Sequence, residues 1–523
     1  MTFLHETVQN AEPNTLPLST TNETLTIYIS LYGPEVHTTN KEHTVFQKIE
    51  EIMGINLEFV SPPAGGDSDE FLATLIASGE YPDIIEDEHS FFNTDYPGGV
   101  AGAIEDGILI NMNELSEKYA PNFYAELARR GAFSYRWVID DNGILCAMGC
   151  EMDPPILDGI QHTGLVLRQD YLDTIGKEVP VTMDELTEVL RAFRDELKIE
   201  YPFGMSPLDT YTGSNCLSCA WDVALNAYQL DADGNVVYSR TMDGYKEFLK
   251  YMNMWYEEGL IDRDFINRTE NDCMKLMYND RAGCIEIGCW NAAEMMKVGI
   301  LENEAFQIVP MVLPRMNSID ETVTVAQPRQ GVIAHGGAWY ITTACKNPEL
   351  AMKFLDWFYS PEGIELTNFG VGELPDGNVT YYIDKDTGLP VFTDFMLNNP
   401  DLAFDAMRRI YTVQGLQSQY HNEFIRQEYD TEIQQSCWAT WKTNMNNSKM
   451  LPDALRLTIE ESEEFIRTQN EIKTYTDEMI YKFICGELNI DENWDNYVIT
   501  VNELGALDNA AIQMAAYERY LNR

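Results

Sequence analysis

Three tryptophans stand at positions where an indole ring could face a ligand. Trp290 follows an apolar strand pattern that ends in Gly288, and a helical pattern begins directly after it. Trp339 follows a Gly-Gly pair, and Trp221 lies in a Cys-Ala-Trp-Asp segment. An indole offers a flat apolar face, so at the end of a strand it can stack on the apolar face of a ligand. We therefore predict ligand contacts for Trp290, Trp339 and Trp221, with core packing as the alternative for each.

Polar and aromatic side chains follow two predicted strands near the N-terminus. Alternating apolar residues predict strands at 25–29, at 55–59 and from 83 onward, with helices at 45–53 and 71–78 between them. This rhythm is typical of right-handed crossovers and a parallel sheet, whose ligands bind at the carboxyl ends of the strands. The ligand contacts predicted after the first and third strands are Tyr32, Glu35, Asp87, His89 and Phe91. Ordinary solvated loops are the alternative.

Motifs for catalysis and metal binding give no positive signal. The sequence lacks a Gly-x-Ser-x-Gly elbow, a His-Glu-x-x-His helix and a Gly-x-x-x-x-Gly-Lys loop, and no carboxylate pair stands out among its 85 acidic residues. No second Cys-x-x-Cys or His pair accompanies Cys216 and Cys219 to complete a zinc site. The cysteines are therefore interpreted as small buried hydrophobes, with a disulfide as an open alternative. Residues 231–235 predict a hairpin turn rather than a calcium loop. No catalytic residue, metal or cofactor is predicted.

One long segment predicts a strand followed by a helix. Residues 331–343 are apolar and rich in strand-forming residues. Asn347 is a favourable N-cap, Pro348 suits the first helical position, and Glu349 lies at the positive end of the helix. Apolar residues then recur at helical spacing from 351 to 358, and a Ser-Pro pair follows. This segment resembles the corresponding region of the extracellular solute-binding protein family 1, whose members capture carbohydrates for ABC transporters.

Other segments extend this resemblance over nearly the whole chain, from about Leu25 to Tyr520. They comprise 167–172, 179–186 and 256–262, together with a tail at 472–478, 482–487, 493–495 and 516–520 that is similar to the larger, lipoprotein-type branch of the family. The turn at 288–290 resembles the Gly-x-Trp turn of maltodextrin-binding relatives, whose tryptophan stacks on the sugar. A capping box at Thr182 and Glu185 predicts a helix to about Leu197. Many large members have a calcium loop after this helix, but residues 196–202 depart from it.

The resemblance implies an α/β protein with the two-lobed type II periplasmic-binding-protein fold, a ligand cleft between the lobes and a helical C-terminal region. Residues 1–23 would be a flexible N-terminal tether. Lobe 1 would comprise 24–155 plus 330–385, and lobe 2 would comprise 156–329 plus 386–523. The chain would cross between the lobes near 152–164, near 325–332 and again beyond Gly370. A length of 523 residues agrees with more than one domain.

Composition narrows the possible partners and locations. The chain has 35 Lys and Arg against 85 Asp and Glu, a formal net charge of −50. Such a surface repels nucleic acid and anionic lipid, and it suits neutral sugars better than polyanions. Residues 1–6 do not resemble the start of a signal peptide, which fits either a cytosolic protein or an exported one without its leader. The resemblance favours the second, lipid-anchored at the extracellular face of the cell membrane.

The resemblance implies the substrate-binding component of an ABC importer. Such a protein captures an oligosaccharide in the inter-lobe cleft and delivers it to permease subunits in the membrane. The chain is expected to be monomeric, to carry no cofactor and not to be an enzyme. The alternatives are a binding protein for a peptide or an acidic sugar, or a glycoside-active enzyme on a similar scaffold.

Overall fold

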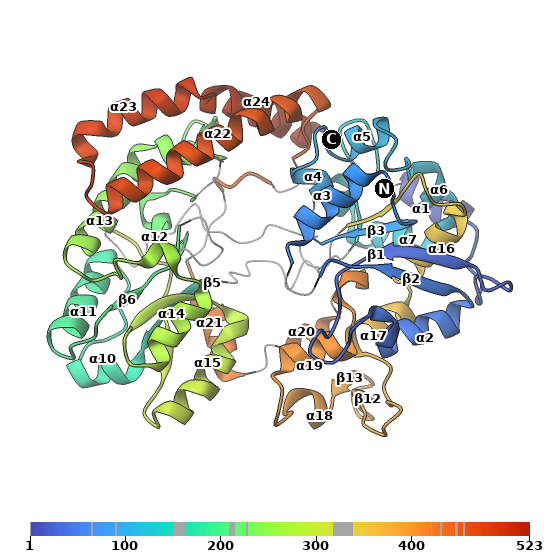
Figure 1. The fold of residues 1–523 in the computed structure, drawn as a ribbon, viewed down its shortest axis with the longest axis horizontal. Coiled ribbons are helices and arrows are strands. Elements are labelled where there is room, and N and C mark those ends of the chain that lie inside the picture. The colour runs from blue at the N-terminus through green and yellow to red at the C-terminus, as the bar shows by residue number, and fades with distance from the viewer. Residues whose placement is uncertain are drawn as a thin grey trace.

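The molecule consists of two bodies, each with its own sheet and its own apolar core (Figure 1). The computed structural model describes residues 2–63, 66–88, 91–149, 163–208, 215–225, 228–316, 338–419, 421–428, 431–444, 448–452 and 455–523. The chain passes from the first sheet to the second between residues 149 and 163 and returns between residues 310 and 338. Most of the first predicted crossing, all of the second, and residues 331–337 lie outside the described residues.

The first body is built on a five-stranded sheet with the order β2-β1-β3-β11-β4. Its strands are β1 (Thr24–Tyr28), β2 (Asn56–Val60), β3 (Ile84–Asp87), β4 (Met148–Gly149) and β11 (Ala338–Ile341). β1 runs parallel to β2 and β3, whereas β11 runs antiparallel to β3 and β4. The strand–helix alternation predicted for the N-terminal segment is confirmed, because α2 (Thr44–Met53) and α3 (Ser68–Ser78) connect these parallel strands.

Local sequence determines where the helices of the first body begin and end. Gly54 ends α2 at φ 65°, a left-handed conformation that favours glycine. The Asn347 side chain accepts a hydrogen bond from Leu350 N at 3.2 Å and caps α16 (Pro348–Trp357), as predicted. The other helices of this body are α4 (Phe91–Thr94), α5 (Gly99–Glu105), α6 (Asn113–Tyr119), α7 (Pro121–Arg130), α8 (Ala132–Val138) and α17 (Pro361–Phe369).

The N-terminal segment forms a helix, α1 (Thr2–Asn10), that lies against α7. Leu4 is 1% exposed and belongs to the first core. Asn14 Nδ2 donates to Tyr119 O at 3.1 Å and to Asp356 Oδ2 at 2.7 Å. The prediction of a flexible tether over residues 1–23 is therefore wrong for this segment, because a buried apolar side chain and hydrogen bonds to the core hold it in place.

The second body has a four-stranded sheet with the order β10-β5-β9-β6. Its strands are β5 (Thr163–Arg168), β6 (Phe203–Gly204), β9 (Cys284–Gly288) and β10 (Ile308–Pro310). Its helices are α10 (Gln169–Ile175), α11 (Met183–Asp195), α12 (Asn215–Ser218), α13 (Asp243–Glu257), α14 (Glu270–Tyr278) and α15 (Cys289–Glu302). The predicted capping box is confirmed at the start of α11, where Thr182 Oγ1 accepts from Glu185 N and Glu185 Oε2 accepts from Thr182 N.

A hairpin of β7 (Tyr228–Leu230) and β8 (Val236–Tyr238) also belongs to the second body. Asp231 Oδ1 accepts from Asn235 N at 2.8 Å, and Gly234 adopts φ 84°. The turn predicted at 231–235 is confirmed.

A small unit after Gly370 packs on the first body. It contains β12 (Tyr381–Ile383), β13 (Pro390–Phe392), α18 (Asp394–Leu397), α19 (Phe404–Tyr411) and α20 (Asn422–Glu428). Phe369 of α17 shares a core cluster with Phe392 and Phe424, and Leu416 lies in the first core. Assignment of 386–523 to lobe 2 is therefore wrong as far as α20, because these side chains are buried against the first body. The other predicted lobe boundaries stay predictions.

The C-terminal region is largely helical, as predicted. α21 (Glu432–Trp441) packs on α15 and β10 of the second body. α22 (Ile459–Ile484), α23 (Ile490–Glu503) and α24 (Ala506–Asn522) follow, and they lie along one side of the molecule (Figure 1). Over the part of the chain that the structure describes, none of the helices combines the length and the apolar character needed to span a bilayer.

Candidate functional site

The carboxyl ends of β1 and β3 meet at one edge of the first sheet, because the two strands are parallel neighbours. Asp87 ends β3 and is 1% exposed. Its two carboxylate oxygens accept from Phe91 N at 2.7 Å and from Phe92 N at 2.9 Å. Asp87 therefore fixes the start of α4, and the partly exposed Phe91 is the side chain that this arrangement presents at the edge.

Tyr32 and Trp339 are both tied to one glycine of the segment after α19. Gly415 N donates to the Tyr32 hydroxyl, and Gly415 O accepts from Trp339 Nε1 at 2.7 Å. A Cβ at Gly415 would lie 2.7 Å from Tyr32 Oη and 3.0 Å from Glu86 Cδ, so a larger residue here would displace these two side chains. Tyr32 is 8% exposed and Trp339 is 0% exposed.

Trp339 packs as a core residue, contrary to the ligand contact predicted for it. Its ring centroid lies 5.7 Å from that of Phe358 and 5.8 Å from that of Tyr359, in edge contacts. The indole N–H, the only hydrogen-bond donor of this side chain, donates to Gly415 O. The physical reason is that β11 is an interior strand of the first sheet, between β3 and β4, and α16 packs on it.

Glu86 is a buried carboxyl group beside these residues. It is 1% exposed, and its Oε1 atom has no hydrogen-bond partner among the described residues. Burial raises the pKa of Glu86 well above its usual value, and the negative charges of Glu88 and Asp87 add to this shift. A neutral carboxyl group at this edge can both donate and accept a hydrogen bond.

The remaining residues predicted on this side differ in placement. Glu35 is exposed, and its Oε1 lies 3.1 Å from Nη2 of Arg409 in α19. His89 lies outside the described residues.

Trp290 lies at the carboxyl end of β9, in the first turn of α15, and is 37% exposed. Its indole covers Gly288, since a Cβ at Gly288 would lie 2.2 Å from Trp290 Cε2. Glu270 Oε1 accepts from Gly288 N at 3.0 Å and from Asn291 Nδ2 at 2.7 Å, which fixes the turn on both sides of the tryptophan. The predicted position of Trp290, at the end of a strand and close to a glycine, is confirmed.

Trp221 is half-buried at the end of a 3₁₀ turn, Cys219–Trp221. Its ring makes edge contacts with Phe248 at 5.6 Å and Tyr251 at 5.3 Å. One side of this indole is therefore used in packing against α13, and the remainder is accessible.

The second body also carries a buried carboxyl group, Glu286 of β9. Its Oε2 accepts from Cys216 N at 3.5 Å, and its Oε1 has no hydrogen-bond partner among the described residues. Burial raises the pKa of Glu286 to about 7. This group lies two residues before Gly288, so it belongs to the same strand end as Trp290.

The sequence prediction did not select Glu286, although a signal for it was present. Glu286 is an acidic residue inside an otherwise apolar strand pattern, Ile-Glu-Ile. A lone charged residue in such a pattern is costly to bury and is therefore a useful indicator of a site.

The described part of the chain contains no group of three His, Cys, Asp or Glu arranged to hold a metal ion. None of the nine cysteines in it forms a disulfide bond, and all except Cys485 are buried. Their burial agrees with the interpretation of these residues as small hydrophobes.

Comparison with known proteins gives matches over most of the chain. A model of the bacterial extracellular solute-binding protein family matches residues 44–370. The fructooligosaccharide ABC transporter substrate-binding protein FusA of Streptococcus pneumoniae is 22% identical over 502 residues, which cover 92% of this chain and 87% of FusA. Lipoprotein LipO of Bacillus subtilis is 23% identical over 447 residues, which cover 80% of this chain and 77% of LipO.

Solved structures agree with this chain in fold. FusA in complex with kestose superposes with a TM-score of 0.77 at 20% identity, covering 96% of this chain and 100% of that one. An HMO-binding solute-binding protein of Bifidobacterium longum infantis gives a TM-score of 0.76 at 17% identity, covering 95% and 99%. The predicted two-lobed α/β fold with a helical C-terminal region is confirmed.

Proposed function

Because this chain belongs to the bacterial extracellular solute-binding protein family, we propose that it is the substrate-binding component of an ABC importer and that its substrate is an oligosaccharide. The observation that carries this proposal is the indole of Trp290. It is 37% exposed and lies over Gly288 at the end of a central strand. A flat, partly exposed ring held by a fixed turn suits the C–H face of a sugar. The names of FusA and of the HMO-binding protein support the same ligand class.

The ligand contacts divide between the two bodies. Trp290 and the accessible part of Trp221 provide aromatic faces on the second body. Phe91 and Glu35, with His89 as a further predicted contact, provide aromatic and polar contacts on the first. Tyr32, Asp87 and Trp339 act behind this surface, because each is buried and shapes the edge through the Gly415 and α4 hydrogen bonds.

Contacts from both bodies to one ligand exist only when the bodies are close together. A ligand that makes such contacts shifts the population toward the closed arrangement. The closed form then docks on the permease subunits of the importer, and the sugar is handed over intact. The protein acts as a monomer at the extracellular face of the cell membrane. A lipid anchor, which the name of LipO supports, keeps it close to the permease.

Calorimetry tests the ligand class. The purified protein is titrated with kestose, with a series of neutral oligosaccharides, with an oligouronate and with a peptide. We expect heat of binding with at least one neutral oligosaccharide and none with the oligouronate or the peptide. Binding of the peptide or of the oligouronate alone would overturn the proposed ligand class.

Product analysis separates a binding protein from a glycoside-active enzyme. The bound oligosaccharide is recovered after prolonged incubation and compared by mass with the sugar supplied. We expect it to be unchanged, and shortened products that depend on the protein would overturn the transport assignment.

A further inference from the structure

The C-terminal helices α22, α23 and α24 form one helical unit that contacts both bodies. At one end of this unit the contact, with the second body, is apolar. Ile472 and Phe483 of α22 and Tyr497 of α23 are buried in the second core. α13, which belongs to that core, packs against both α22 and α23. An extensive apolar contact of this kind makes these helices part of the second body.

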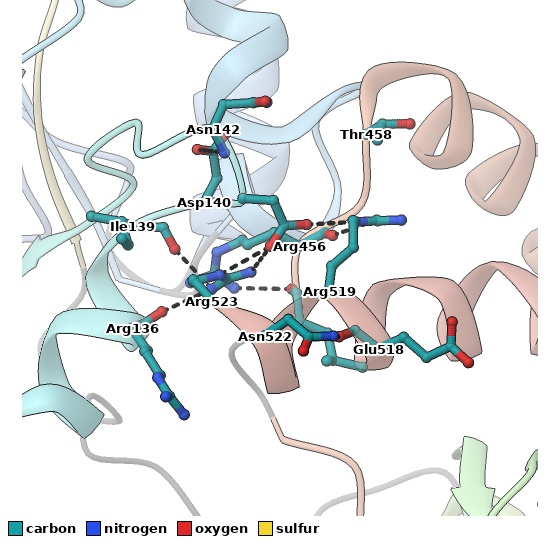
Figure 2. A network of polar contacts seen from close by, with 12 residues as sticks. Arg136, Ile139, Asp140, Asn142, Arg456, Thr458, Glu518, Arg519, Asn522 and Arg523 are labelled. Carbon is teal, nitrogen blue, oxygen red and sulfur yellow. Dashed lines mark hydrogen bonds and ion pairs between the residues drawn. The ribbon is translucent and has the colours of Figure 1, made fainter.

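The opposite end of the same helical unit is held to the first body by charged groups and by Ile459 of α22, which lies against Gly98 at the start of α5. Arg519 Nε of α24 donates to Asp141 Oδ2 at 2.6 Å, and Arg523 Nε donates to Asp141 Oδ1 at 3.0 Å. Arg523 Nη1 also donates to the carbonyl oxygens of Arg136 and Ile139, both at 2.8 Å. Figure 2 shows Arg519 and Arg523 pointing toward the turn that carries Asp140 and Asn142.

Further hydrogen bonds hold both partners of this contact in position. On the first body, Asp140 Oδ1 accepts from Asn142 N at 2.8 Å and from Ile144 N at 2.7 Å, which fixes the turn around Asp141. On the helical unit, Glu461 accepts from Arg519 Nη1 at 2.8 Å. Glu461 also completes the capping box with Thr458 at the start of α22. One carboxylate thus joins the first turn of α22 to the last turn of α24.

Arg456 makes a second contact with the first body, next to this network. Arg456 Nη2 donates to Trp137 O at 3.3 Å, and its guanidinium group lies 5.4 Å from the centroid of the Trp137 ring. Trp137 and Tyr520 form a small buried cluster of their own. The apolar part of this junction is therefore small compared with the second core, so charged hydrogen bonds carry much of it.

We propose that the contact of Asp141 with Arg519 and Arg523, joined through Arg519 to Glu461, is an anchor that restricts how far the first body moves relative to the second in the ligand-free protein. The helical unit moves with the second body because it shares its core. The first body is attached to that unit by directional charge pairs of low exposure, with side chains 5% exposed for Arg523 and 18% for Asp141. Removal of the Asp141 carboxylate leaves the two bodies folded and loosens the junction between them. This anchor acts whichever ligand the protein binds.

Distance measurements between the bodies test this proposal. Spin labels on non-canonical amino acids replace Lys48 of α2 and Lys275 of α14, whose side chains are 42% and 66% exposed, so that the native cysteines stay unlabelled. Pulsed dipolar spectroscopy on ligand-free protein gives the distribution of distances. We expect Asp141→Asn and the double variant R519Q/R523Q to broaden this distribution. Wild type in high salt should broaden in the same direction, because salt screens charge pairs.

The matched control removes a charge pair of similar geometry inside one body. Glu258 accepts from Arg191 Nε at 2.7 Å and from Arg191 Nη2, and both residues belong to the second body. Glu258→Gln should leave the distance distribution unchanged. Circular dichroism of each variant confirms that both bodies are folded. A distribution for folded Asp141→Asn and R519Q/R523Q that equals that of wild type would overturn the proposal. So would equal broadening by Glu258→Gln.

Discussion

Trp290 and Trp339 have the same side chain but different surroundings. Trp290 is 37% exposed over a glycine, whereas Trp339 is 0% exposed between Phe358 and Tyr359. Trp290→Ala should weaken oligosaccharide binding by more than about 1 kcal/mol, as is typical of an aromatic anchor, with little change in melting temperature. Calorimetry and thermal unfolding measure the two effects.

Trp339→Ala is the matched control for that experiment. Loss of a fully buried indole leaves a cavity and a carbonyl oxygen without its donor, so the free energy of unfolding should fall by about 3–5 kcal/mol. A stability loss in Trp290→Ala as large as this one, with normal affinity, would identify Trp290 as a core residue instead.

Glu286 makes the stability of the protein depend on pH. Burial raises its pKa from 4.5 to about 7, so the folded protein keeps a proton that the unfolded chain releases at neutral pH. Its contribution to the free energy of unfolding is therefore fully present below the unfolded pKa and is lost as pH rises through about 7. Between acidic pH and pH ~8, the free energy of unfolding of the wild type should fall by up to about 3 kcal/mol more than that of Glu286→Gln. Urea unfolding across this range measures the difference.

An exposed glutamate controls for general charge effects. Glu304 is exposed on the same body, and Glu304→Gln should follow the pH profile of wild type. If the free energy of unfolding changed with pH in the same way for wild type and Glu286→Gln, Glu286 would not be a buried, protonated carboxyl group.

At the scale of elements, the turn from β9 into α15 positions the indole of Trp290. Gly288 has φ −74° and ψ 144°, which alanine adopts without strain, so Gly288→Ala tests the indole and not the backbone. The new methyl group would collide with the ring. Because the ring must move, we expect a loss of oligosaccharide affinity comparable to that of Trp290→Ala, together with a change in tryptophan fluorescence. Unchanged affinity would show that the position of the ring does not matter for binding.

The helix α1 is a second element with a testable role. Leu4 is 1% exposed in the first core, whereas Leu16 is 41% exposed. Leu4→Ala should lower the free energy of unfolding by about 2–5 kcal/mol, and Leu16→Ala should change it by less than about 1 kcal/mol. Thermal unfolding of the two variants compares them directly. Equal, small effects would restore the description of residues 1–23 as a tether.

At the scale of the whole molecule, a net charge of −50 determines how binding responds to salt. A neutral oligosaccharide has no charge to be repelled, so its affinity should be almost constant between low and high ionic strength. An anionic oligosaccharide should show no binding at low salt, where screening is least, and any affinity for it should appear only at high salt. Calorimetry of one neutral and one anionic sugar at two salt concentrations measures this. A strong salt dependence for the neutral sugar would indicate a coupled ion.

Residue patterns predicted much of the fold because local rules determine them. The capping box at Thr182, the N-cap at Asn347 and the turn at 231–235 depend on hydrogen bonds within a few residues, and all three are confirmed. The position of Trp290 follows from one strand, one glycine and one helix start in direct succession. These features need no information about distant parts of the chain.

Other features depend on which segments the fold brings together. The burial of Trp339 depends on helices that cover the central strands, and the role of Asp87 depends on the start of α4. The placement of 386–428 on the first body depends on Phe369 and Leu416 finding apolar neighbours there. Local periodicity was enough to predict the strand ends that carry candidate contacts, whereas the two-lobed architecture was implied by the resemblance to the solute-binding family. The folded chain was needed to learn which of those contacts are buried and how the C-terminal helices join the two bodies, because burial and charge pairing arise between residues hundreds of positions apart.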